Sequence, residues 1–294
     1  PGGLDGLRRE DGRPPAGRGV LSRAPRGAGP APSPPPLDLA AVAAALDPLV
    51  ERYERPAFIA DDPIAVVHAF DDPADQETIG LYAAILAWGR RSVILAKLAD
   101  LVERMGGQPH RFVRDFRPGR DGARLDGFKH RTFSSADAVA LTTALRAVLE
   151  RHGTVGGLFA AGLRADDPDI GPAIQAFSDT LLTIVPEAGM RSKHLARPST
   201  GSACKRLAMY ARWMTRPGPV DLGVWAGVRP DQLVLPLDVH TGRQARRLGL
   251  LTRATDDWRA VQEVTDVLRA LCPSDPARYD YALFGLGAYE GRAI

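Results

Sequence analysis

Apolar side chains recur at steps of three and four residues along most of the chain from Leu37 onward. In residues 37–53 this period places Leu39, Val42, Leu46 and Leu49 on one side, the pattern of a helix that packs on a core. Alternation of apolar and polar positions, which is typical of a half-buried strand, is scarce. The pattern predicts an all-α protein of roughly nine or ten helices without an internal repeat.

Start and stop signals divide this pattern into separate helices. Ser134 or Ser135 caps one helix, Gly106 and Gly107 end another, and Pro186 ends a third. Two helices form an antiparallel pair joined at Trp88, Gly89 and Arg90. In chain order, the predicted helices cover 37–53, 75–88, 91–105, 135–151, 170–185, 204–216, the residues after Asp238, 256–272 and 276–290.

Residues 1–36 differ in composition from the rest of the chain. They are rich in Pro, Gly and Arg and contain few large apolar side chains, so burial cannot offset the entropy lost on ordering. We expect a disordered tail there and a helical domain over residues 37–294.

The overall composition limits the classes of function. The 294 residues carry 38 Lys and Arg against 35 Asp and Glu, a net charge of +3, and only two cysteines, Cys204 and Cys272. Neither a disulfide framework nor a cysteine or HExxH metal motif is present, so we expect no metal and no cofactor. The chain contains no run of about 18 apolar residues, which is the length that a membrane-spanning helix needs. We expect a soluble, cytoplasmic and monomeric protein.

The segment from Arg191 to Arg216 is strongly basic. It contains seven Lys or Arg residues and no Asp or Glu, and its local charge favours a polyanionic partner. In the predicted helix 204–216, the spacing places Lys205, Arg212 and Arg216 together on the face opposite the apolar side chains. The apolar stripe of that helix consists of Leu207, Tyr210, Ala211 and Met214.

Lys205 lies in the first turn of this helix. The positive end of the helix and the adjacent Arg206 both favour the neutral amine, the form that an amine nucleophile needs. Upstream, "PSTGSACK" supplies Ser and Thr as caps and Gly201 for a tight turn, whose N–H groups could hold a phosphate. The alternative is that Lys205 belongs to a solvated basic face.

Asp238 is the only acid in the run "PLDVHTGRQARRLGLL". It precedes a helix that carries Arg243, Arg246 and Arg247, three candidates for phosphate contacts. An N-cap is the ordinary role of an Asp at this place. A second role would require its carboxylate to face Lys205.

This run resembles the helix-hairpin-helix DNA glycosylases, which include endonuclease three and the 8-oxoguanine enzymes. Their catalytic Asp stands in a pattern that reads roughly V-D-x-H, and this chain reads Leu237, Asp238, Val239 and His240 at the similar place. Their catalytic Lys ends a hairpin written approximately L-P-G-V-G-x-K. "STGSACK" is similar in Gly201 and Lys205 but has Thr200 in place of the Pro and Ala203 in place of the second Gly.

Other stretches extend the resemblance. "LYAAILAWGRRSVILAKLADLVERMG" looks like the opening helix pair of those enzymes, and the stretch from "VQEVTDVLRALC" to "GLGAYE" looks like the end of their core. The segment between Lys205 and Asp238 is similar in length to that of the archaeal 8-oxoguanine branch. The four cysteines of the iron–sulfur loop of endonuclease three are missing.

Over nearly all of residues 37–290, the chain also resembles a bacterial family of unknown function. "RPAFIADDP", "AAILAWGRRS", "HRTF", "SACKRL", "RWM" and "PLDVHTGRQARRLGLL" carry this likeness. The family itself supplies no function.

The glycosylase resemblance implies a two-lobed helical fold, with the hairpin and the Asp segment at about 191–251, and excision of a damaged base, an oxidised purine, from double-stranded DNA. Lys205 would attack the sugar C1′ and form a Schiff base that permits strand cleavage, while Asp238 would stabilise the developing positive charge. Substrate contacts are expected from Trp88, Arg90, Arg91, Gly201, Arg206, His240 and Arg243. Trp213, Trp225 and Cys204 are assigned to structure.

Two other functions remain open. The chain could be a non-catalytic DNA-binding protein on the same fold, or an enzyme acting on RNA or nucleotides. All three hypotheses leave one geometric question, which is whether the Lys205 amine and the Asp238 carboxylate share one cleft.

Overall fold

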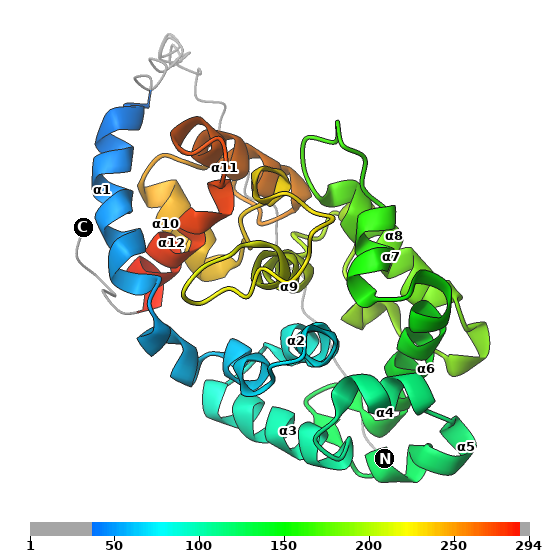
Figure 1. The fold of residues 1–294 in the computed structure, drawn as a ribbon. Coiled ribbons are helices and arrows are strands. Elements are labelled where there is room, and N and C mark those ends of the chain that lie inside the picture. The colour runs from blue at the N-terminus through cyan, green and yellow to red at the C-terminus, as the bar shows by residue number, and fades with distance from the viewer. Residues whose placement is uncertain (1–36, 289–294) are drawn as a thin grey trace, which may run out of the picture. The chain divides into compact units, whose positions relative to one another are not determined.

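The computed structural model describes residues 37–288, and this part of the chain is mostly helical (Figure 1). The expectation of a disordered tail over residues 1–36 lies outside the described residues. The α-helices are α1 (Leu39–Tyr53), α2 (Pro73–Leu86), α3 (Arg91–Arg104), α4 (Pro109–Asp115), α5 (Pro118–Asp121), α6 (Ser135–His152), α7 (Val155–Ala161), α8 (Gly171–Thr183), α9 (Lys205–Thr215), α10 (Val239–Arg247), α11 (Trp258–Leu271) and α12 (Tyr279–Ala288).

Short 3₁₀ helices connect these elements. They are η1 (Pro56–Asp61), η2 (Pro63–Ala69), η3 (Gly122–Leu125), η4 (Pro186–Ala188), η5 (Ser192–His194), η6 (Pro198–Thr200), η7 (Pro230–Gln232) and η8 (Pro276–Arg278). Most begin at a proline, whose fixed φ suits the first helical position and whose missing N–H costs nothing there. None of the 3₁₀ helices, nor the short helices α4, α5 and α7, was predicted from the sequence.

The longer helices begin and end close to the predicted positions because their caps are local. Ser134 and Asp137 form a capping box at the start of α6, in which Ser134 N donates to Asp137 Oδ2 at 2.7 Å. Gly153 ends the same helix at a φ of 76°. The predicted helix 276–290 is instead η8 followed by α12, and residues 289 and 290 lie outside the described part.

The expectation of an all-α fold is wrong in one detail. Lys129–His130 (β1) and Phe133–Ser134 (β2) pair as a small antiparallel hairpin. Arg131 turns this hairpin at a φ of 52°, a conformation that few non-glycine residues adopt. Because each strand has only two residues, the alternation of apolar and polar positions is too short to be recognised in the sequence.

Helix α9 lies among α2, α10 and α12 (Figure 1). Its predicted apolar stripe is buried, and Tyr210 Oη donates to Glu77 O of α2 at 2.8 Å. Helix α12 packs against both α1 and α10. These contacts bring the first turn of α9 beside the start of α10, although the whole of residues 216–238, which include η7, separates the two helices. No helix in residues 37–288 is long and apolar enough to span a membrane.

Candidate active site

Lys205 and Asp238 face each other across the gap between α9 and α10. Lys205 Nζ lies 3.6 Å from Asp238 Oδ2, and each side chain is 28% exposed. The pair is therefore partly withdrawn from water but open to a ligand. The contact that the sequence left in question is present.

The Asp238 carboxylate uses its two oxygens differently. Oδ1 caps α10, because it accepts hydrogen bonds from His240 N at 2.8 Å and from Thr241 N at 3.0 Å. Oδ2 faces Lys205. The capping bonds fix the orientation of the carboxylate, so that one side chain both starts the helix and presents an oxygen to the amine.

The start of α9 differs from the prediction. The N-cap is Cys204, whose φ of 51° is left-handed and whose side chain makes no capping bond, so neither Ser nor Thr caps this helix. Gly201, at a φ of 76°, ends the three-residue turn η6. The segment before Lys205 is thus a series of 3₁₀ turns that follow α8. Cys204 itself is buried, and burial raises the pKa of its thiol to about 12.

A cavity of about 420 Å³ opens beside the Lys205–Asp238 pair. Its volume falls within the range of about 300–1,000 Å³ that is typical of small-molecule sites. Among the predicted contact residues, the cavity lining includes Trp88, Arg91, Arg206 and His240 in addition to Lys205 and Asp238. The structure therefore gathers residues from α2–α3, α9 and α10 around one space. Arg90, Gly201 and Arg243 are exposed and lie outside the lining.

Trp88 forms part of the cavity wall. Its indole Nε1 is buried and has no hydrogen-bond partner among residues 37–288. The hairpin holds the indole in place, since His130 Nε2 bonds to Trp88 O at 3.1 Å and the Arg131 guanidinium lies 5.0 Å from the ring centroid. Because Nε1 is shielded inside the protein, Trp88 lines the cavity through other atoms of the residue.

Arg206 has a different environment from the one expected. Its Nη1 donates to Ile85 O at 2.6 Å and its Nη2 to Lys193 O at 3.4 Å. Burial lowers the pKa of its guanidinium. These bonds connect the start of α9 to the end of α2, so Arg206 also has a structural role at the cavity wall.

The prediction of an exposed basic face on α9 is wrong for Arg212 and Arg216. Both are 4% exposed. Arg212 pairs with Asp221 and Asp280, and Arg216 pairs with Asp221 as well as with two further acids. The helical period identifies which residues share a face, but it cannot reveal that acids from distant segments cover that face.

Two carboxylates at the site were missed in the sequence. Asp62 lines both the 420 Å³ cavity and a smaller one of about 30 Å³, and Lys205 and Asp238 line the same two cavities. Asp280 lines the smaller one. A signal for Asp62 was available, because Asp followed by Pro63 in "RPAFIADDP" is typical of an N-cap, and Asp62 Oδ1 does accept from Ile64 N at 3.1 Å.

The three carboxyl groups have different acidities. Burial raises the pKa of Asp238, but Lys205 and the N–H groups of Thr241 and His240 outweigh it, so that its pKa lies below the usual value. Burial raises the pKa of Asp62, and Ile64 N, Arg212 and Lys205 offset this only in part. Burial also raises the pKa of Asp280 to about 6. Asp238 is therefore the most readily ionised of the three.

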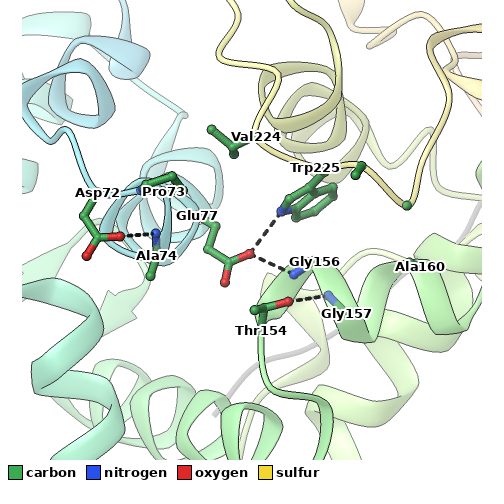
Figure 2. Close-up of a pocket in the computed structure, with 12 residues that line it drawn as sticks. Asp72, Pro73, Ala74, Glu77, Thr154, Gly156, Gly157, Ala160, Val224 and Trp225 are labelled. Carbon is green, nitrogen blue, oxygen red and sulfur yellow. Dashed lines mark hydrogen bonds between the residues drawn. The ribbon is translucent and has the colours of Figure 1, made fainter.

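In a second cavity, the carboxylate of Glu77 is already hydrogen-bonded through both of its oxygens. This cavity measures about 470 Å³ and lies between α2, α7 and the segment around Trp225 (Figure 2). Figure 2 shows Glu77 directed toward Trp225 and Gly156, whose Nε1 and N donate to it at 3.1 and 2.9 Å. Val155 N donates to the other oxygen at 3.0 Å. Because these bonds satisfy both carboxylate oxygens, Glu77 joins structural elements, as the assignment of Trp225 to packing implies.

A comparison with protein families finds a match over residues 62–289, to a family described as Protein of unknown function (DUF2400). The chain belongs to this family. Comparisons with curated proteins and with solved structures gave no match. The DUF2400 match begins at Asp62 and so spans every carboxylate and cation of the site described above.

The basic residues that follow Asp238 also fall within the DUF2400 match, and they differ in environment. Arg246 Nη2 donates to Asp256 Oδ1 at 2.6 Å, and its Nε donates to Arg253 O, so its charge is already paired. Arg243 is exposed and has no ion-pair partner among residues 37–288. Of these two arginines, Arg243 is the better placed for a phosphate.

Proposed function

We propose that this protein is a DNA repair glycosylase that removes a damaged base, an oxidised purine according to the sequence resemblance, with Lys205 as nucleophile and Asp238 as its partner. The observation that carries the proposal is the 3.6 Å contact between Lys205 Nζ and Asp238 Oδ2 at the edge of a 420 Å³ cavity. An amine and an ionised carboxylate beside a space of this size suit nucleophilic attack on a sugar that becomes positively charged.

The surroundings of the pair support a flipped-out nucleotide as the ligand. A base within a duplex is out of reach, so an enzyme that acts on it must extrude it into a pocket. Trp88 is an aromatic residue of the cavity wall and suits stacking of a base. Exposed Arg90 and Arg243 lie near the residues that line the cavity and suit the flanking phosphates.

The proposed reaction begins with loss of a proton from the Lys205 ammonium group, which passes by way of Asp238 Oδ2 to solvent, so that Asp238 is ionised again before the base departs. The neutral amine attacks C1′ as the bond from C1′ to the base breaks. The resulting adduct rearranges to a Schiff base, which permits strand cleavage by β-elimination. Asp238 stabilises the positive charge on the sugar during base departure.

Borohydride trapping tests this proposal. The protein is incubated with duplexes that contain 8-oxoguanine, uracil or a pre-formed abasic site, and borohydride is added to reduce any Schiff base to a stable adduct. We expect an adduct with the wild type and none with Lys205→Ala. Lys193→Ala is the matched control, because Lys193 is an exposed lysine of the same basic stretch and lies outside the cavity lining.

Asp238→Asn provides a second variant that should fold normally, since an Asn side chain caps a helix about as well as Asp. We expect it to bind duplex DNA but to release the base far more slowly. If the wild type gives no adduct and releases no base across the panel, the glycosylase proposal fails. Salt-dependent DNA binding that persists without any cleavage would instead identify a non-catalytic DNA-binding protein.

A further inference from the structure

Two carboxyl groups with different environments face the proposed reaction centre. Asp62 and Asp238 line the same two cavities, and Lys205 lines both as well. Asp238 Oδ2 is in contact with the Lys205 amine, whereas Asp62 comes from the N-cap of η2, on another wall. Enzymes that cleave bonds to sugars commonly divide the work between two carboxyl groups, one ionised and one protonated.

We infer that Asp62 is the general acid of base excision, which delivers a proton to the departing base while Asp238 remains ionised beside Lys205. This inference rests on the glycosylase function proposed above. It assigns a catalytic role to a residue that the sequence resemblance did not identify.

The local geometry leaves one oxygen of Asp62 available for this role. Oδ1 accepts the hydrogen bond from Ile64 N at 3.1 Å, which holds the side chain at the start of η2. The other oxygen has no hydrogen-bond partner among residues 37–288, although the side chain lines the cavity. A carboxyl group that is anchored by one oxygen and open through the other can donate a proton in a fixed direction.

Asp280 is less suited to the same role. It lines only the smaller cavity, and its Oδ2 accepts a hydrogen bond from Arg212 Nη1. The guanidinium therefore occupies an oxygen that would otherwise carry or receive a proton. Asp62 has no such partner and borders the larger space in which a base would fit.

The charges around Asp62 are compatible with a protonated carboxyl group. Burial raises its pKa, and the opposing influences come from Ile64 N, from Arg212 and Lys205 of α9, and from Arg91 of α3. Across the shared cavities it also faces Asp238, His240 and Asp280. The pKa of Asp238 is shifted in the opposite direction, and such a divergence separates an acid from an ionised partner.

The proton and electron count closes without another reactant. The bond from C1′ to the base breaks with its electron pair on the base, and the Asp62 proton passes to a ring nitrogen, so the base leaves neutral. The neutral Lys205 amine forms the new bond to C1′ and becomes positively charged. The Asp62 carboxylate then receives the excess proton of that adduct, which restores the acid for the next turnover.

The decisive test separates base departure from the steps that follow it. Asp62→Asn keeps the size of the side chain and the cap on η2 but cannot deliver a proton. We expect its single-turnover release of 8-oxoguanine to fall by about 10²-fold or more, the range of general acid catalysis. Its borohydride trapping on a pre-formed abasic site should be unchanged, because no base departs there. Asp61→Asn is the matched control, since Asp61 is the exposed neighbour.

Two further measurements exclude a purely structural effect. A duplex that contains 7-methylguanine carries a base that is already cationic, so Asp62→Asn should release it much more nearly at the wild-type rate. With 8-oxoguanine, the wild-type rate should fall as the pH rises through the pKa of Asp62, because the protonated form is the active one. Asp62→Asn should lack this decline, and Asp62→Glu should restore it in part.

The possible failures are distinguishable. Equal release of 8-oxoguanine by the wild type and Asp62→Asn would overturn the role of Asp62 and leave the glycosylase proposal intact. Equal losses with 8-oxoguanine, 7-methylguanine and the abasic site would assign Asp62 a structural role and also overturn the inference. If the wild type neither releases a base nor traps the abasic site, both proposals fail.

Discussion

Arg212 is the residue whose replacement tests the buried charge network most directly. It is 4% exposed on α9 and pairs with Asp221 and Asp280. Its guanidinium also lies 4.4 Å from the ring centroid of Tyr281. Arg212→Met keeps the length and much of the apolar stem but removes the charge, so the perturbation is mainly electrostatic.

The expected loss follows from what each acid would retain. Asp221 keeps Arg216 and the hydroxyl of Tyr281, but Asp280 loses the cation that it contacts. Removal of one partner from a buried ion pair typically costs about 3–5 kcal/mol, because the remaining charge is uncompensated. We expect the unfolding free energy of the variant to be about 3 kcal/mol lower at pH 7. This value is near the lower end of that range, because only Asp280 is left without a cation.

The pH dependence provides a second signature. Burial raises the pKa of Asp280 in the folded protein to about 6. Protonated Asp280 therefore contributes to folding stability at pH values below its pKa in the unfolded chain, and this contribution is lost as the pH rises through about 6. Without Arg212 the pKa of Asp280 in the folded protein rises further, so folding stability continues to fall up to a higher pH. Above pH 6 the difference between the variant and the wild type should grow by up to about 1.4 kcal/mol per pH unit.

Urea unfolding followed by far-ultraviolet circular dichroism at pH 6, 7 and 8 measures both effects. Arg243→Met is the matched control, because Arg243 is exposed on α10 and its replacement should change stability by no more than about 0.5 kcal/mol. A loss below about 1 kcal/mol that does not vary with pH would refute the argument that Arg212 compensates a buried carboxylate.

Two other substitutions test local features of the fold. Burial raises the pKa of Asp137, but Arg191 and Ser134 outweigh it and lower that pKa to about 2; Asp137→Asn should therefore cost about 2 kcal/mol at pH 7 in urea unfolding. That cost should diminish as the pH falls from 3.8 toward about 2. Asp166→Asn is the control and should have no effect, because the Asp166 side chain is 90% exposed. Gly156→Ala would place a Cβ 2.5 Å from Trp225 Nε1, and such overpacking should lower the unfolding free energy by about 1–3 kcal/mol in the same assay. Gly119→Ala meets no atom within 4 Å, so a comparable loss there would contradict the steric explanation.

Much of the fold was predictable because its signals are local. The three- and four-residue period identified the long helices, and Ser134 and Asp238 identified where two of them begin. Caps and periodicity involve residues within a few positions of one another, so one sequence contains them. Short helices and the small hairpin escaped because they are too brief to show a period.

The candidate site was only partly predictable. Lys205 and Asp238 were recognisable as a pair by resemblance, and Trp88 and Arg91 as neighbours, and all four line one cavity. Asp62 and Asp280 were missed, because neither stands in a motif that connects it to Lys205. Arg212 and Arg216 were assigned to a solvated face, because their helical spacing is the same whether water or acids surround them.

The sequence by itself therefore determined the helical character of the chain, the ends of its long helices and the candidate pairing of Lys205 with Asp238. The tertiary structure alone decided which charges are buried and which carboxyl groups share the cavity. The physical reason is that periodicity and capping act over one or two turns, whereas desolvation and Coulomb interactions depend on distances between segments far apart in the chain.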